Sequence, residues 1–190
     1  MEENFSPQQS LALIQSMITK TKNNLSDNRF YFLLWGWLSF IAIIGQFFLK
    51  VILHYDKHYL VWLVTIPAAI ITMVRASRQS NRAVVKTYVA DSMNFLWMGI
   101  GISFFVLSFI VSNMRGGWNN AWPLYILFYG LGTFVSGKIL QFRPFIIGGI
   151  FNWVLAVVAI YIPFDYQLLL AATAILTSYI IPGYLLRSNN

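Results

Sequence analysis

The sequence predicts an all-α fold: a polytopic membrane helical bundle of about six transmembrane helices, preceded by an amphipathic helix. Hydrophobic residues make up 58% of the 190 positions and charged residues only 10%. That leaves too little polar material to cover a soluble globule of this size. The apolar runs are long and do not alternate with polar residues, which favours membrane-spanning helices over the strands of a barrel.

The expected spans follow one another with short connections. A helix needs about 20 mostly apolar residues to cross the hydrocarbon layer, and six stretches reach or approach that length. They are Phe30–Leu49, Tyr59–Val74, Asn94–Ser112, Pro123–Leu140, Phe145–Ile162 and Tyr166–Leu186. The second and fifth are short, but flanking aromatic and basic side chains can extend them into the headgroups. The expected organisation is a cytoplasmic segment (1–29), a transmembrane domain (30–187) and a short cytoplasmic tail (188–190).

The distribution of basic residues predicts the orientation. With the N-terminus inside, ten of the thirteen Lys and Arg residues fall on the inner side, and only Lys50, Lys57 and Arg115 fall outside. Cytoplasmic loops carry such an excess of positive charge. We therefore expect an inner (plasma) membrane protein with both termini in the cytoplasm.

The segment before the first span has the pattern of an amphipathic helix. Ser6 and Pro7 provide an N-cap followed by proline at the first helical position, and Leu11, Ile14 and Ile18 recur at helical spacing. A helix from about Pro7 to Leu25 is expected. It either lies on the inner leaflet and steadies the first span, or docks a partner.

Four basic residues between the second and third spans are spaced to share one side of a helix. If the second helix continues past Val74, Arg75, Arg78, Arg82 and Lys86 form a single stripe. Each contributes about 1 kcal/mol of attraction to anionic headgroups. This pattern predicts anionic lipid, and not nucleic acid, as the partner of these residues.

The stretch GLGTFVSGKI (130–139) imitates a phosphate-binding loop without its context. Gly132, Gly137 and Lys138 match the pattern G-x-x-x-x-G-K-[ST], but Ile139 stands where the motif needs a magnesium ligand. No strand is expected before Gly132, and such a loop works at a water-exposed strand-to-helix junction. We therefore expect neither a nucleotide nor any other cofactor.

Small residues in the fourth and fifth spans predict close helix packing instead. Small side chains at helical spacing let two backbones approach closely in lipid. A short connection joins these two spans, so a tight hairpin is expected. The residues assigned to this packing are Gly130, Gly132, Ser136, Gly137, Gly148 and Gly149.

A layer of polar residues is expected near the middle of the bundle. Asn152 is the most polar of them, and Thr133 and Tyr129 on the neighbouring helix are at the right depth to bond to it; Thr177 lies at similar depth. Such residues either hold helices together or line a binding cavity. No Asp, Glu, His or Arg falls in the centre of a span, which argues against proton-driven transport.

The chain has no pattern that predicts catalysis. His54, Asp56 and His58 could bind a metal in principle, but on a helix Asp56 would point away from both histidines, so no metal site is expected. No paired carboxylates or Ser-His pair falls within the bundle. The protein is therefore not expected to be an enzyme.

Two segments carry a resemblance to a known group. The runs YGLGTFVSGKILQFRPFIIGGIFNWVLA (129–156) and SPQQSLALIQSMITKTKNNLSDNRFYFLLWGW (6–37) resemble a family of small uncharacterised bacterial multipass inner-membrane proteins. The resemblance implies no site residues. From the residues themselves two functions are open: a non-enzymatic membrane protein acting through protein or self-association, or a small-solute transporter or small-molecule receptor with a mid-membrane site.

Overall fold

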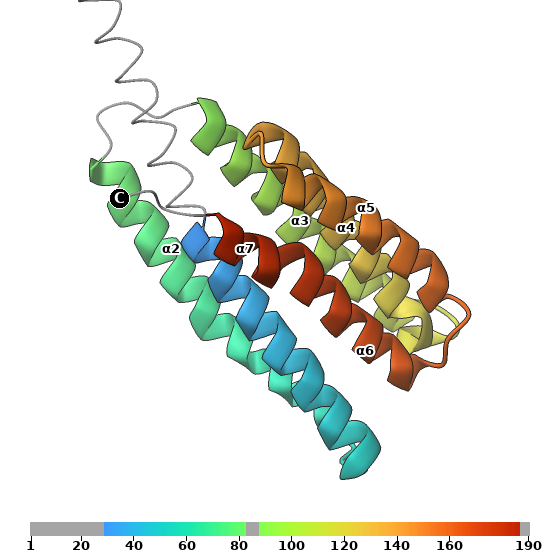
Figure 1. The fold of residues 1–190 in the computed structure, drawn as a ribbon. Helices are drawn as coiled ribbons and strands as arrows, with labels where there is room; N and C mark the ends of the chain where they lie inside the picture. Colours follow the sequence, from blue (N-terminus) through green and yellow to red (C-terminus); the bar gives the residue numbers. More distant parts are fainter. Residues whose placement is uncertain (1–28, 83–87, 187–190) are drawn as a thin grey trace, which may run out of the picture.

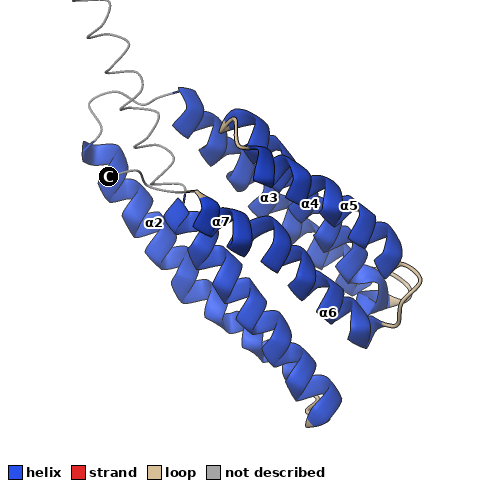
Figure 2. Ribbon diagram, viewed as in Figure 1, coloured by secondary structure: helices blue, strands red, loops and turns tan. Residues whose placement is uncertain are grey.

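The computed structural model describes residues 29–82 and 88–186, and all regular structure in these ranges is helical (Figure 2). The all-α expectation is thereby confirmed. The expected N-terminal amphipathic helix, Lys86 and the C-terminal tail lie outside the described residues.

Six long helical elements follow one another along the chain. The first runs over Arg29–Ile52 and ends in a π-helical turn, η1 (Phe48–Ile52). A 3-10 helix, η2 (His58–Val64), leads into α2 (Thr65–Arg82), and α3 (Tyr88–Asn113) is followed by the short η3 (Gly117–Asn120). The remaining elements are α4 (Ala121–Ile139), α5 (Arg143–Ala159) and α6 (Phe164–Ile175), which is continued by the π-helical η4 (Leu176–Ile180) and α7 (Ile181–Leu185).

Local sequence explains where the helices begin and end. Proline lies in the first turn of α5, where its missing N–H costs no hydrogen bond, and Pro163 occupies the N-cap position of α6. After α3 the chain turns at Gly116, whose φ of 98° is in the left-handed region that glycine adopts readily. These signals keep the connections short.

Four of the six elements are long and apolar enough to cross a membrane by length and composition. They are Arg29–Ile52, His58–Arg78, Val89–Asn113 and Phe164–Leu185. The other two elements, α4 and α5, are not among these four. α5 has 17 residues, and α4 mixes glycine, serine, threonine and lysine with its apolar residues.

The helices form one elongated bundle (Figure 1). The first helix and α2 make a hairpin on one side, and the helix from α6 to α7 lies beside the first helix. α4 and α5 pair on the other side, and α3 packs against α4. The first helix begins, α2 ends and α5 begins at one end of the bundle (Figure 1). We call it the basic end, because these helix ends include Arg29, Arg78 and Arg143.

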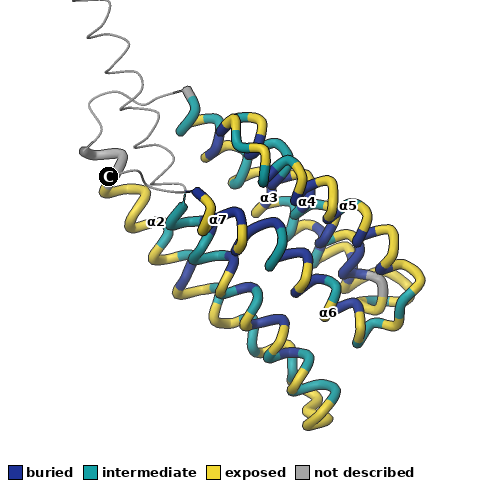
Figure 3. The backbone as a smooth tube through the Cα atoms, in the orientation of Figure 1, coloured by how far each residue is buried: buried dark blue, intermediate teal, exposed yellow. Residues whose placement is uncertain are grey.

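Burial is concentrated in the second half of the chain. Figure 3 shows buried residues along α4 to α7, whereas α2 is mostly exposed. Phe145, Ile126, Leu168 and Ile175 are among the largest fully buried side chains. In α2, Ala68 is the one buried residue among the side chains that the structure describes. The first hairpin therefore attaches to the bundle mainly through its first helix.

Candidate functional site

The α4–α5 hairpin is packed backbone to backbone. A Cβ added at Gly149 would lie 2.7 Å from the Phe134 backbone nitrogen and 2.8 Å from the Gly130 carbonyl oxygen. A Cβ at Gly137 would lie 2.7 Å from the Ile146 nitrogen. Only glycine permits this approach, as expected from the small residues of these spans.

The other small residues serve different contacts from the one expected. A Cβ on Gly132 would lie 2.9 Å from the Trp97 ring of α3, and one on Gly148 would lie 2.8 Å from the Ser178 Cα of η4. Ser136 is fully buried and donates to the Gly132 carbonyl within its own helix, at 2.7 Å. The expectation that all of them join α4 to α5 is wrong for Gly132 and Gly148. Gly132 is two positions from Gly130, and Gly148 is one position from Gly149, so on a helix each faces a different neighbour.

Asn152 finds its partner on a helix other than the one expected. Its Nδ2 donates to Ser178 Oγ at 3.0 Å, and the Ser178 hydroxyl donates to the Ala174 carbonyl at 2.6 Å. Asn152 and Ser178 are both fully buried. The bond therefore ties α5 to the π-helical turn after α6, and Thr133 and Tyr129 do not take part in it.

The remaining polar residues of this layer do not converge on a shared site. The Thr133 hydroxyl donates to the Tyr129 carbonyl at 2.7 Å, and the Thr177 hydroxyl donates to the Thr173 carbonyl at 2.9 Å, both within one helix. The Tyr129 hydroxyl meets Ser39 Oγ of the first helix at 3.3 Å. The expected site made of these residues and Asn152 is therefore not formed, because the two threonine hydroxyls bond within their own helices and the Tyr129 hydroxyl bonds to the first helix.

The structure instead contains a groove between the first helix, α2 and α3. It has a volume of about 440 Å³, within the range of about 300–1,000 Å³ typical of small-molecule sites. Its walls and floor are mainly apolar and aromatic. The walls include Trp35, Thr72, Trp97 and Phe104, and the floor is made by Tyr129 and Tyr179.

Aromatic packing fixes the shape of this groove. The rings of Trp97 and Tyr179 meet edge to face at 5.5 Å, and those of Tyr129 and Tyr179 at 5.4 Å. Phe104 lies 4.9 Å from the Tyr129 ring. Edge-to-face pairs at these separations are favourable. The floor, contributed by α4 and η4, and the adjoining wall of α3 thus form a pre-formed surface.

The polar groups around the groove are neutral. Trp35 Nε1 donates to Thr72 Oγ1 at 3.1 Å, which joins the first helix to α2. Among the described residues that line the groove, none is charged at neutral pH, and the polar ones carry hydroxyl, amide or indole groups. The groove is therefore suited to an uncharged, mainly apolar group.

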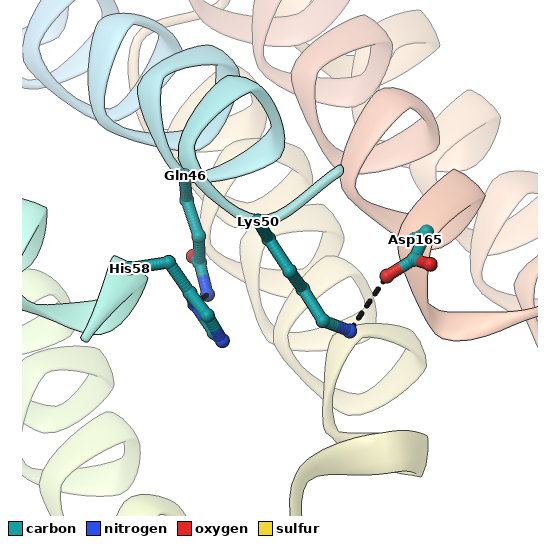
Figure 4. Close-up of polar contacts among 4 residues, drawn as sticks. All are labelled: Gln46, Lys50, His58 and Asp165. Carbon is teal, nitrogen blue, oxygen red and sulfur yellow. Dashed lines mark hydrogen bonds and ion pairs between the residues drawn. The ribbon is translucent and has the colours of Figure 1, made fainter. Parts of the chain in front are cut away.

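A separate polar cluster lies at the end opposite the basic end (Figure 4). Lys50 Nζ contacts Asp165 Oδ1 at 2.6 Å and lies 3.9 Å from the centre of the Phe164 ring, so the first helix is tied to α6. Gln46 meets His58 Nδ1 at 3.2 Å and accepts from Trp62 Nε1 at 2.7 Å. These contacts hold the first helix against α6 and η2.

The three residues His54, Asp56 and His58 do not form a metal site. His58 faces Gln46, while His54 Nδ1 lies 3.3 Å from the Ile52 carbonyl. Within residues 29–82 and 88–186 no group of three or more His, Cys, Asp or Glu side chains could hold a metal ion.

The expected basic stripe is described only in part, because Lys86 lies outside the described residues. α2 continues past Val74 and ends at Arg82. Arg75 and Arg78 are exposed, and the Arg75 guanidinium lies 4.0 Å above the Phe30 ring.

Sequence reasoning missed the groove, because its residues come from five separate helical elements. Trp97 and Phe104 are unremarkable within an apolar span, and only their meeting with Tyr179 makes a site.

Comparisons with protein-family models, curated proteins and solved structures gave no match to this chain.

Proposed function

We propose that the protein is a non-enzymatic integral membrane protein that acts through side-on association with another membrane protein or with a second copy of itself. The observation that carries this proposal is the exposure of α2 and α3. Apolar residues cover the outward faces of both helices, with Ile71 51% and Phe105 76% exposed. In lipid, helices associate through packing of such faces and not through the hydrophobic effect.

Several features support placement in a membrane with both termini on the basic side. Four helices are long and apolar enough to cross, and α4 and α5 complete six antiparallel elements. The described Lys and Arg residues are more numerous towards the basic end than towards the opposite end, the bias that is typical of cytoplasmic loops. In the proposed placement, Arg75 and Arg78 meet the anionic headgroups of the inner leaflet.

The absence of cysteine from the sequence makes this proposal simple to test. Single cysteines are placed at Ile71 and Phe105, with Val157 on α5, which is 58% exposed, as the matched control. Crosslinking in native membranes uses oxidation for a second copy of the chain and a photoreactive reagent on the same cysteine for a partner without a thiol. It is expected to give a defined crosslinked species from Ile71→Cys or Phe105→Cys and none from Val157→Cys. Equal or absent crosslinking at all three positions would contradict association through α2 and α3.

A second candidate is a receptor for a small apolar molecule, which the groove favours. The groove has the volume of a ligand site and a pre-formed aromatic floor. A transporter is less well supported, because Asn152 and Thr133 are fully buried, and the Asn152 Nδ2 and the Thr133 hydroxyl donate hydrogen bonds within the bundle. Retention of a small non-lipid molecule through purification would favour the receptor.

A further inference from the structure

We propose that the groove binds one acyl chain of a phospholipid whose anionic headgroup rests at the basic end. The proposal uses the membrane placement argued above, but it concerns the interior of the groove and not the outward faces through which association occurs. Three properties of the groove identify a phospholipid as the ligand. They are the residues that line the groove, the direction in which it opens and the charges beyond its end.

The lining suits a hydrocarbon chain. Apolar and aromatic side chains predominate, and tyrosine is the one ionisable type among the lining residues of the described ranges. Met73, Met93 and Met98 also line it, and the unbranched thioether side chain adapts its shape to an irregular apolar partner. A charged solute would lose its hydration here without gaining a counter-charge.

The opening faces the lipid phase and not water. The groove lies between α2 and α3, and Met73 and Met98 at its edges are 70% and 54% exposed. The outward faces beside them carry Ile71 and Phe105, which are also exposed and apolar. In a bilayer the molecules that reach such an opening are the lipid chains themselves.

The charges beyond the groove select the headgroup. On α2 the groove residues run from Ala69 to Ala76 towards the basic end, and the exposed Arg75 and Arg78 flank Ala76 there. Arg29 begins the neighbouring helix, and Asp91 is the one acidic residue that the described chain places at this end. A lipid with its tail in the groove would carry its phosphate to this excess of positive charge. Each arginine near the surface adds about 1 kcal/mol of attraction.

Two glycines of α3 provide a matched pair of test variants. Gly101 lines the groove and Gly99 does not, yet a Cβ added at either would meet no atom within 4 Å. Gly101→Leu therefore places a side chain in the groove, while Gly99→Leu places the same side chain outside it. Both replace a glycine in the same helix, so their effects on helix stability are alike.

The measurement is the amount of phospholipid that stays with the purified protein. Wild type and both variants are reconstituted in vesicles of phosphatidylethanolamine and phosphatidylglycerol, re-extracted, washed with detergent and analysed by mass spectrometry. We expect one phospholipid per wild-type or Gly99→Leu protein, enriched in phosphatidylglycerol. We expect about tenfold less retention in Gly101→Leu, the change that about 1.4 kcal/mol of lost affinity produces. Equal retention by the two variants would overturn the proposal.

A second comparison tests the headgroup. The double variant Arg75→Gln, Arg78→Gln is expected to lose the enrichment in phosphatidylglycerol, and unchanged enrichment would contradict the role of the basic end. Crosslinking through a cysteine at Ile71 is measured on the same samples. Ile71 does not line the groove, so the two readouts are independent. Crosslinking without retained lipid would support the association and contradict lipid binding in the groove. Retained lipid without crosslinking would support lipid binding and contradict the association.

Discussion

Gly149→Ala is expected to destabilise the bundle by forcing α4 and α5 apart. The new methyl group would lie 2.7 Å from the Phe134 nitrogen and Cβ and 2.8 Å from the Gly130 carbonyl oxygen. Both of its closest polar neighbours are backbone atoms of α4, so no side-chain rotation can relieve the contact. The two helices must move.

The size of the effect follows from that movement. An ordinary Cβ contact is 3.4 Å or longer, so the helices must separate locally by about 0.7 Å, and a gap of about 0.5–1 Å forfeits a quarter to a half of the dispersion energy of each contact. Overpacking of this kind typically costs about 1–3 kcal/mol. The Trp153 ring, which packs against Gly130 and lies 5.1 Å from the Phe134 ring, would shift with α5.

The assay is reversible unfolding in mixed detergent with increasing dodecyl sulfate, followed by circular dichroism and tryptophan fluorescence. Gly99→Ala is the control, because its Cβ meets nothing within 4 Å and alanine is the better helix former by about 1 kcal/mol. We expect Gly149→Ala to unfold at lower dodecyl sulfate than wild type and Gly99→Ala to unfold no earlier than wild type. Equal midpoints for the two variants would refute the backbone-to-backbone packing.

Three further outcomes are expected. A double-mutant cycle of Asn152→Ala and Ser178→Ala should give a coupling free energy of about 0.6 kcal/mol in the same unfolding assay, and zero coupling would show that the bond at 3.0 Å contributes nothing. A cycle of Lys50→Ala and Asp165→Ala should give about 0.2–1 kcal/mol that decreases with salt, since the pair is 31% and 43% exposed; a coupling that does not change with salt would contradict this. Gln141→Cys, in the α4–α5 connection, should react with an impermeant thiol reagent in inverted vesicles and not in intact cells, and the reverse pattern would invert the proposed orientation.

The helices could be predicted from the sequence because each depends on local information. Runs of apolar residues predicted all six elements, although α2 continues past Val74 to Arg82 and α3 begins at Tyr88 and not at Asn94. The tight hairpin was also predictable, because α4 and α5 are adjacent in the chain and Gly149 must face its neighbour across a short connection. These inferences need no knowledge of how distant helices are arranged.

The site could not be predicted, because it depends on which helices lie side by side. Asn152 needed a partner at its own depth, and the sequence indicated Thr133 and Tyr129, whereas the position of η4 makes Ser178 the partner. The π-helical turn that presents Ser178 to Asn152 and Tyr179 to the groove has no simple sequence signal. Small residues such as Gly132 likewise show that a close contact exists but not which helix makes it.

The most direct test of the central claim, that this protein acts by association within the membrane, is its intact mass after extraction from native membranes with the surrounding lipid. Native mass spectrometry is expected to show the 21.8 kDa chain in a defined homo-oligomer or with a stoichiometric protein partner. A monomer without any protein partner, in membranes where the protein is at its natural abundance, would contradict the claim; a retained small non-lipid molecule on that monomer would favour the receptor instead.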